Sequence, residues 1–185
     1  MTREEALKLV QEEVQEPELV RHMKAVAAIM EGLAGRLGED TERWYLAGLL
    51  HDIDYEQTKH DPERHSIVGA EMLAALGLDR EIVYAVKAHG LHEETVPRRS
   101  TMDKALCAAD GLSGLVTAAA YVMPSHTLAE VQVKTIKKKF KDKAFARGAD
   151  REEIRTCEAF GLSLEEFFAV ALEAMQRHAA ALGLA

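Results

Sequence analysis

The sequence predicts an all-α protein: a helical bundle with additional C-terminal helices. Nearly every segment repeats its apolar residues at helical spacing, and no segment shows the sustained alternation expected of a strand. Alanine, leucine, glutamate and lysine dominate, which favours helix, and only four prolines and twelve glycines interrupt the 185 residues. A chain of this length is expected to form a single domain, residues 1–185.

The first helices follow from apolar spacing and capping residues. An amphipathic helix is expected over residues 3–14. Pro17 suits the first turn of a longer helix, which should end at Gly38. Asp40 or Thr41 can cap the next helix, "ERWYLAGLLHD". The polar stretch "YEQTKHDPERH" that follows is expected to be a loop.

The later helices are set apart by short polar or glycine-containing connections. We expect "LGLD" and "LHEETVPRRS" to be connections, and Pro124 to follow the end of a long helix. The expected helices cover about 63–76, 79–90, 102–122, 127–145, 150–160 and 163–182. No linker separates the last third. A core over about 17–122 and a C-terminal extension over about 125–185 should therefore form one domain.

Composition and charge exclude several classes of protein. The net charge of -8 argues against general nucleic-acid binding. Cys107 and Cys157 form no CxxC pair, which indicates a reducing cytoplasm. The N-terminus is too charged for a signal peptide, and no apolar run approaches the roughly 20 residues that a membrane helix needs. The sequence predicts a soluble, cytoplasmic protein with no membrane partner.

Several histidines and aspartates fall on the apolar faces of the expected helices. His22, for example, shares the stripe of Leu19 and Val26. A single histidine on such a face is more often a hydrogen-bonded core residue, and a single aspartate often caps a helix or meets an arginine. Burying a charge is costly unless it is paired or bound to a metal. Together, however, these imidazoles and carboxylates form the ligand set of zinc, iron or manganese.

The order of these residues resembles the H…HD…D signature of the HD-domain superfamily of metal-dependent phosphohydrolases. His22 precedes "AGLLHDID", which contains His51 and Asp52, and Asp110 follows in "AADG". The resemblance spans roughly residues 17–122. It implies an all-α HD-domain bundle in which these four side chains bind one metal ion. Many relatives carry a glycine after "HDI", where this chain has Asp54.

Two further histidines resemble those of dinuclear HD proteins, in which they hold a second metal ion. They are His65 in "HSIVGAEML" and His89 in "VKAHGLH". The resemblance implies that Asp52 bridges both ions. Iron or manganese is expected, with nickel, cobalt, zinc or magnesium as alternatives. His92 competes with His89 for this role, and His60 competes more weakly with His65.

The resemblance also implies a reaction. The expected activity is hydrolysis of a phosphoester or phosphoanhydride in a nucleotide or related small phosphorylated metabolite, for example a dinucleoside polyphosphate. Asp52 and Asp54 are the candidate catalytic residues. Asp54 can orient the nucleophilic water or accept its proton. Alternatively, it caps the next turn or holds a metal-bound histidine.

Substrate phosphates need cationic partners, and a run of lysines offers them. On a helix, four of these lysines share one side, which we expect to face the substrate. These four are Lys134, Lys137, Lys138 and Lys141. A solvated helix face is the competing interpretation of this run. His92 and Arg98 are further candidates for substrate binding.

Three other functions are compatible with the same ligands. Some HD-domain proteins with this ligand order are mixed-valence di-iron oxygenases. The four core ligands also suffice for a mononuclear nucleotidase. Finally, the chain can be a non-catalytic nucleotide-binding module that uses its metal only for folding.

Overall fold

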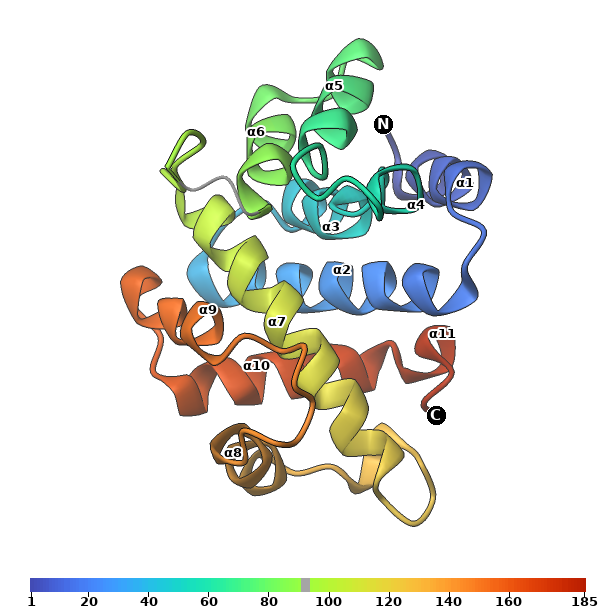
Figure 1. Ribbon diagram of the computed structural model, residues 1–185. Helices are drawn as coiled ribbons and strands as arrows, with labels where there is room; N and C mark the ends of the chain where they lie inside the picture. Colours follow the sequence, from blue (N-terminus) through green and yellow to red (C-terminus); the bar gives the residue numbers. More distant parts are fainter. Residues whose placement is uncertain (91–93) are drawn as a thin grey trace.

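The computed structural model describes residues 1–90 and 94–185. Within these residues every regular element is helical and none is a strand, so the protein is all-α as predicted (Figure 1). The main helices are α1 (Arg3–Glu13), α2 (Pro17–Leu37), α3 (Thr41–Leu50), α5 (Ile67–Ala75), α6 (Arg80–His89), α7 (Thr101–Tyr121), α8 (Val133–Lys141) and α10 (Leu164–Arg177). Shorter elements are α4 (Tyr55–Thr58), η1 (Leu128–Glu130), α9 (Arg151–Arg155), η2 (Thr156–Phe160) and α11 (Ala179–Leu182).

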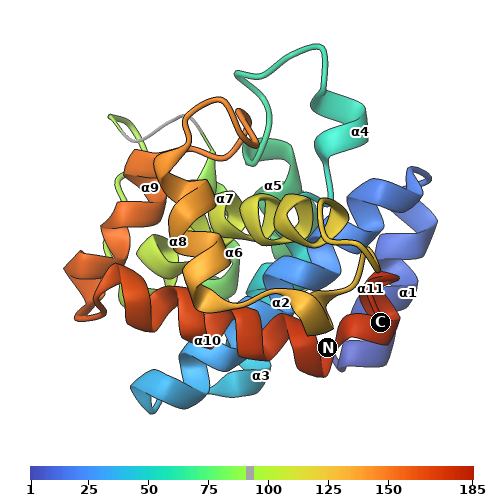
Figure 2. The same ribbon diagram turned by 90° about the horizontal axis from the view of Figure 1, so that it is seen from below.

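Helix α2 lies at the centre of the fold. Its first position is Pro17, and it ends at Gly38, whose φ of 76° is the left-handed conformation that glycine adopts at helix ends. In Figure 1, α3 lies on one side of α2, α10 lies on the other, and α7 crosses in front. Seen from below, α8 and α9 lie beside α7 (Figure 2). The centre of α2 is therefore covered by helices from both ends of the chain.

A glycine allows α2 and α3 to approach closely. A Cβ atom added at Gly48 would lie 2.7 Å from the Cα atom of Ala27 and 2.9 Å from the carbonyl oxygen of Val26. Such distances are too short for non-bonded atoms, so only glycine fits at this crossing. The close approach brings the end of α3, where His51 follows, next to α2 and His22.

The structure differs from the predicted boundaries at several loops. The expected helix over 127–145 is two pieces, η1 and α8, separated by extended residues 131–132. The expected loop after "HDID" contains the one-turn helix α4, and α5 begins only at Ile67. The last helix breaks at His178 into α10 and α11. At the two helix breaks the apolar spacing continues through the turn, so periodicity alone does not reveal them.

The last third of the chain shares the core of the first two thirds. A single cluster of buried apolar residues includes Met30 of α2, Leu112 of α7 and Phe167 of α10. Helix α10 packs against α2 closely enough that a Cβ atom added at Gly32 would lie 2.9 Å from that of Ala174. Among the helices that the structure describes, none is long and apolar enough to cross a membrane.

Candidate metal centre

Six predicted metal ligands meet at one place, although five helical segments supply them. His22 lies on α2, Asp110 on α7, and His89 is the last residue of α6. His51 and Asp52 directly follow α3, and His65 precedes α5 in a turn. His51 and Asp52 are buried at the end of an apolar helix. The helices thus deliver the ligands mainly at their ends, next to the central helix α2.

Asp52 divides the cluster into two half-sites. Its Oδ2 atom lies 3.5 Å from Nε2 of His22 and 3.3 Å from Nε2 of His51. Its Oδ1 atom lies 3.4 Å from Nε2 of both His65 and His89. Asp110 joins the first half-site, with Oδ1 3.1 Å from Nε2 of His22. A carboxylate with one oxygen in each group has the position that a ligand shared by two ions requires.

The other ring nitrogen of each histidine is held by an acceptor. Nδ1 of His51 faces the carbonyl oxygen of Gly48 at 2.8 Å, and Nδ1 of His89 faces that of Val86 at 2.5 Å. These carbonyls can only accept a hydrogen bond, so they place the proton on Nδ1. Each Nε2 is then left with its lone pair toward the cluster, which is the tautomer of a metal ligand.

Side chains do the same for the other two histidines. Nδ1 of His65 lies 3.1 Å from Oδ1 of Asp54. Nδ1 of His22 lies 3.2 Å from the hydroxyl of Ser113, which itself donates to the carbonyl oxygen of Asp110 at 2.8 Å. Because the hydroxyl proton of Ser113 is used in that bond, its oxygen accepts a hydrogen bond from the Nδ1–H of His22. Ser113 is a residue that sequence reasoning missed; its signal is the spacing of three residues after Asp110 on the same face of α7.

These side chains fit a bound cation. Nε2 of His22 and Nε2 of His51 are 3.1 Å apart, and with both protons on Nδ1 two lone pairs face each other. Nε2 of His89 is buried without a hydrogen-bond partner in the described part of the chain. Buried polar atoms are almost always satisfied, so both features indicate a missing positive group between the nitrogens. The cluster supports divalent metal binding, by a His/Asp donor set suited to such ions.

The protein around the site favours ionised carboxylates. Burial works to raise the pKa of Asp52, but the imidazoles of His51 and His22 lower it well below its ordinary value. Burial likewise opposes ionisation of Asp110, and His22 lowers the pKa of that carboxyl. For His22, burial works to lower the pKa, but Asp110 and Asp52 raise it to about 10, so without a metal ion a proton takes the place of the cation at Nε2. Asp52 and Asp110 are therefore ionised near neutral pH and can bind cations.

Asp54 contacts the cluster from within the protein, away from solvent. The side chain is fully buried. One oxygen faces His65, and the other accepts a hydrogen bond from the backbone N–H of Gly69 at 2.8 Å. This geometry matches the second of the two roles considered for Asp54, in which it holds a histidine.

A strained turn fixes the second half-site. Ser66, directly after His65, has a φ of 68°, which is uncommon for a residue other than glycine. Its hydroxyl donates to the carbonyl oxygen of Lys87 at 3.0 Å, two residues before His89. A Cβ atom added at Gly90 would lie 3.1 Å from that of Ser66. Ser66 and Gly90, which the sequence analysis did not single out, therefore hold the segments of His65 and His89 together.

The structure describes five of the six predicted substrate-binding residues, and one of them, Arg98, donates from Nε to the carbonyl oxygen of Ala88, next to His89, at 3.3 Å. His92 lies outside the described residues. Arg98 is largely buried and pairs with Glu153 of α9 at 3.1 Å. Helix α8, which carries the lysine run, packs against α7 and α10, and Lys137 pairs with Glu165 at 2.6 Å. None of the four lysines forms an ion pair or hydrogen bond with the cluster over residues 1–90 and 94–185. Their contact with a substrate remains a prediction.

The chain resembles known proteins over the segment that carries this cluster. The family model described as the HD domain matches residues 19–115, a range that contains all six clustered side chains. Ribonuclease Y of Oleidesulfovibrio alaskensis is 38% identical over 97 residues, covering 52% of this chain and 18% of that protein. Ribonuclease Y of Desulfotalea psychrophila is 33% identical over 138 residues, covering 72% of this chain and 26% of that protein. Ribonuclease Y of Thermosipho melanesiensis gives the same identity and coverage.

The similarity covers only a small part of each relative. The chain spans 18% of the length of the first relative and 26% of the other two. No solved structure matches the chain.

The relatives also correct one prediction. We predicted a small phosphorylated partner from the family resemblance, no membrane partner from the lack of a long apolar run, and no general nucleic-acid binding from the acidic net charge. That prediction of partners is wrong, because the relatives are enzymes named for the cleavage of RNA. Net charge is a property of the whole surface, whereas binding depends on the groups around one site.

Proposed function

The chain belongs to the HD-domain family of metal-dependent phosphohydrolases, and on that premise we propose that it holds two divalent ions and hydrolyses phosphodiester bonds of single-stranded RNA. The supporting observation is the position of Asp52, with two imidazole nitrogens within 3.5 Å of Oδ2 and two within 3.4 Å of Oδ1. One half-site would consist of His22, His51, Asp52 and Asp110. The other would consist of Asp52, His65 and His89. Iron or manganese is the expected metal, because carboxylates accompany the imidazoles.

Divalent ions held by these residues would supply Lewis acidity toward phosphoryl oxygens and would lower the pKa of a bound water, so that hydroxide is available as the nucleophile near neutral pH. The chain's own residues hold that chemistry in place. Gly48, Val86, Ser113 and Asp54 fix the four imidazoles, and Asp52 keeps its charge because its pKa is low. Orientation is thus set before any substrate arrives, which reduces the reorganisation that the reaction requires.

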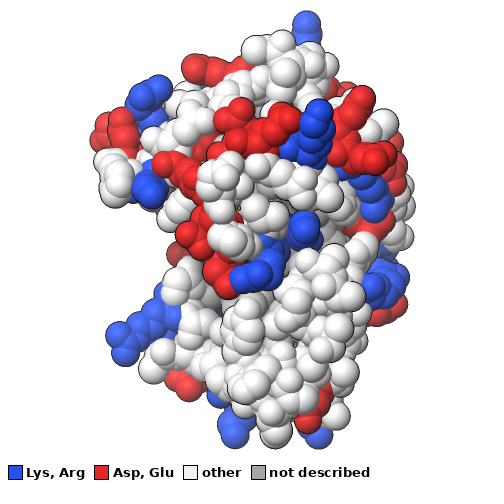
Figure 3. Space-filling model, turned by 90° about the vertical axis from the view of Figure 1, so that its right-hand side faces the viewer, with Lys and Arg blue, Asp and Glu red and all other residues white. Residues whose placement is uncertain are grey.

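The proposal of RNA as substrate rests on the three relatives and on the family. The surface shown in Figure 3 carries interspersed acidic and basic side chains and no broad basic patch. We therefore expect affinity to come from groups close to the metal centre rather than from a wide electrostatic surface. The two cysteines are free and buried, which agrees with the cytoplasmic location that we also propose.

Cleavage of a labelled single-stranded RNA by the purified protein tests the proposed function. The metal-free protein is loaded in turn with manganese, iron, cobalt, nickel, zinc and magnesium. We expect shortened products from the loaded wild type, and a loss of at least about a thousandfold in Asp52→Asn, because the shared carboxylate is removed. Absence of cleavage by wild-type protein that contains two ions per chain would contradict the proposal.

Metal analysis tests the two half-sites separately. We expect two ions per wild-type chain and one in His89→Ala, since only the second half-site loses a ligand. His60→Ala is the matched control, because His60 is exposed and should leave two ions. One ion in the wild type, unchanged by His89→Ala, would instead indicate a mononuclear site.

Two rival functions have distinct signatures. A di-iron oxygenase would give a mixed-valence signal in electron paramagnetic resonance and would consume oxygen, and the relatives' names favour hydrolysis instead. A module that uses metal only for folding would unfold on metal removal without ever turning over RNA.

A further inference from the structure

Among the described ligands of the metal centre, His22 and Asp110 are the most exposed to solvent. The side chains of His51 and His89 are 0% and 2% exposed, whereas those of His22 and Asp110 are 27% and 34% exposed. His22 and Asp110 lie on α2 and α7. A substrate therefore meets the centre first along these two helices.

A pocket of about 260 Å³ begins at His22 and continues between the same two helices. It is lined by Glu18, Arg21, His22, Ala25, Gly114, Thr117, Ala118, Tyr121, Leu182 and Leu184. On α7 the lining residues Gly114, Thr117 and Tyr121 follow Asp110 by four, seven and eleven positions. At 1.5 Å per residue the pocket covers about 6–16 Å along the helix from Asp110. A group joined to a phosphate at the centre would lie within it.

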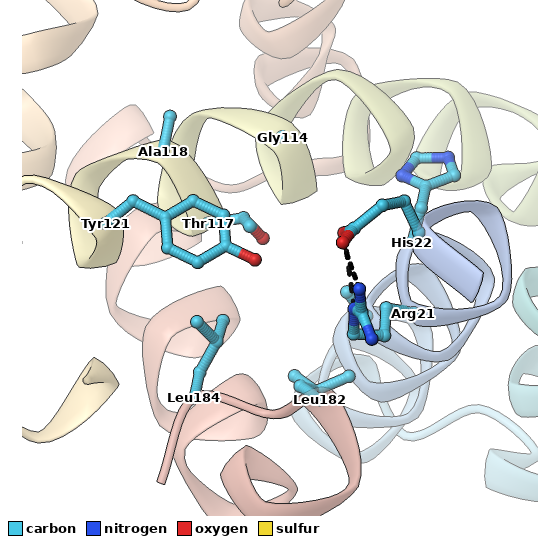
Figure 4. Close-up of a pocket in the computed structure, with 10 residues that line it drawn as sticks. Arg21, His22, Gly114, Thr117, Ala118, Tyr121, Leu182 and Leu184 are labelled. Carbon is cyan, nitrogen blue, oxygen red and sulfur yellow. Dashed lines mark hydrogen bonds and ion pairs between the residues drawn. The ribbon is translucent and has the colours of Figure 1, made fainter. Parts of the chain in front are cut away.

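The lining combines an apolar floor with polar edges. Ala25, Leu182 and Leu184 are buried apolar residues of the floor. Figure 4 shows Tyr121 and Thr117 on one side of the pocket and Arg21, paired with Glu18, on the other. A side chain added at Gly114 would meet nothing within 4 Å, so the pocket is open beside the α7 backbone. The floor is fixed, because the N–H of Leu128 donates to the carbonyl oxygen of Leu184 at 2.9 Å.

The aromatic ring of Tyr121 lines this pocket and can stack against a planar ring of a ligand. Tyr121 is 46% exposed, and its ring belongs to the pocket wall. Bases of single-stranded nucleic acids stack on such side chains, whatever their sequence. The volume lies just below the range of about 300–1,000 Å³ typical of pockets for drug-sized ligands, so it suits one ring system rather than an oligonucleotide.

Arg21 adds a cation beside the ring. Its ion pair with Glu18 is largely exposed, with side chains 38% and 65% accessible. Exposed pairs contribute little free energy, so Arg21 can exchange Glu18 for another anion at small cost. Arg21 directly precedes His22 in the sequence. The planar N–H donors of its guanidinium can bind two oxygens of a phosphate at once.

We propose that this pocket binds the base of the nucleotide next to the scissile phosphate, stacked on Tyr121, while Arg21 contacts a phosphate of the same single strand. The inference rests on the proposed RNA hydrolysis and assigns its substrate subsite. The rest of the strand lies outside the pocket.

Kinetics with variants of the pocket wall provide one test. Tyr121→Ala should raise KM for a short RNA about tenfold, as expected for loss of one stacked base, and Tyr121→Phe should stay near wild type. Val122→Ala is the matched control, since Val122 is 55% exposed, adjacent in sequence and absent from the pocket lining. With an RNA that lacks the base next to the cleaved bond, wild type and Tyr121→Ala should have equal KM. An unchanged KM for Tyr121→Ala on the intact RNA would overturn the proposal.

A binding measurement separates this inference from the proposed function. Adenosine, which has no phosphate, is titrated into the metal-free protein and followed by nuclear magnetic resonance. We expect shifts of the amide signals of Gly114, Ala118 and Leu184 that disappear in Tyr121→Ala and persist in Val122→Ala. If wild type fails to cleave RNA but these shifts occur, hydrolysis is wrong and the base pocket stands. If the shifts are absent or lie elsewhere, the base pocket is wrong, whatever the cleavage result.

Discussion

At the scale of single residues, the centre depends on atoms that never touch a metal. Each clustered histidine has an acceptor at Nδ1, and the acceptors come from a carbonyl, a hydroxyl or a carboxylate. Asp54 is the one charged member of this group. Both of its oxygens are occupied within the protein, by His65 and by the N–H of Gly69. We therefore propose that Asp54 is a positioning residue for His65.

Replacement of Asp54 by asparagine tests this role. One carboxylate oxygen becomes an amide NH₂, so either His65 or the N–H of Gly69 faces a donor instead of an acceptor. We expect about tenfold to a hundredfold weaker metal affinity at the half-site of His65 and His89, the usual effect of losing such a partner. Affinity at the half-site of His22 should change little. Calorimetric titration of metal-free protein measures both affinities.

A role for Asp54 as general base predicts something different. Both metal affinities would then stay at their wild-type values, and the pH dependence of the cleavage rate would lose its lower-pH limb. That combination would contradict the positioning role.

The sequence identifies the candidate ligands and one group that can orient them, Asp54, but not the serines that hold the other segments. His22, His51, Asp52 and Asp110 stand in a recognisable order with an unusual polar–apolar context, so they could be predicted. Ser113 and Ser66 could not, because a serine in a helix or turn is common and its role depends on a tertiary contact with His22 or with the carbonyl oxygen of Lys87. The φ of Ser66 likewise has no signature in a single sequence.

At the scale of elements, the α2–α3 crossing sets the distance between His22 and His51. Gly48→Ala would place a methyl group 2.7 Å from the Cα atom of Ala27 and force the helices apart. We expect a loss of about 1–3 kcal/mol in the free energy of unfolding, typical of overpacking. Gly35→Ala on α2 is the control, because nothing lies within 4 Å of its added Cβ. That change should stabilise the protein by about 0.5–1 kcal/mol.

Urea denaturation of the metal-free proteins measures both changes. Equal midpoints for Gly48→Ala and wild type would show that the crossing can relax, and would remove the argument from close approach. Metal affinity of the first half-site should fall in Gly48→Ala and stay unchanged in Gly35→Ala.

A second contact joins four helices through one carboxylate network. Glu31 of α2 accepts from Arg3 of α1 at 2.6 Å and lies 3.0 Å from Nε2 of His178, which follows α10. Arg3 also pairs with Glu42 of α3 at 2.5 Å. Partial burial works to raise the pKa of Glu31, but Arg3 and His178 lower it below its ordinary value.

This lowered pKa predicts a pH-dependent stability. A group whose pKa is lower in the folded state stabilises fully above its unfolded pKa of about 4.5, and the contribution is lost as the pH falls through the folded value. Glu31→Gln should therefore cost about 0.5–1.5 kcal/mol at pH 7 and progressively less below pH 4.5. Thermal unfolding at pH 7, 5, 4 and 3 provides the comparison. A difference that is constant with pH would show that the ionised carboxylate contributes nothing.

Helix boundaries illustrate the limits of periodicity at this scale. The starts of α2 and α3 were predictable because Pro17 and Asp40 have local roles, and Asp40 does accept hydrogen bonds from the N–H groups of Glu42 and Arg43. The break between η1 and α8 was not, because its cause is non-local. There Leu128 pairs with the backbone of Leu184, and Gln176 donates to the carbonyl oxygens of Leu128 and Val131. These partners lie far away in sequence.

At the scale of the whole molecule, the family match and the folded unit have different extents. The HD domain match ends at residue 115, whereas α10 covers one side of α2. Phe167, Ala171 and Met175 of α10 are fully buried. Without α10, the face of α2 around Gly32 would lie open to water. We therefore propose that residues 1–185 fold as one domain and that the C-terminal extension is part of it.

A fragment of residues 1–124 tests that proposal. It contains all six clustered side chains but lacks α8 to α11, so apolar surface of α2 and α7 becomes exposed to water. This exposure costs about 25 cal/mol of unfolding free energy per Å². Natural domains are stable by only about 5–15 kcal/mol, and each buried large side chain that is lost costs about 2–5 kcal/mol. Loss of the buried residues of α8 and α10 together is therefore comparable with the whole margin. We expect the fragment to show no cooperative thermal transition and to bind no stoichiometric metal. Adding the fragment of residues 125–185 should restore both, because the helices it carries refill the open face of α2. A fragment of residues 1–124 that melts within a few degrees of the full chain and binds two ions would show instead that the HD core is complete without α10.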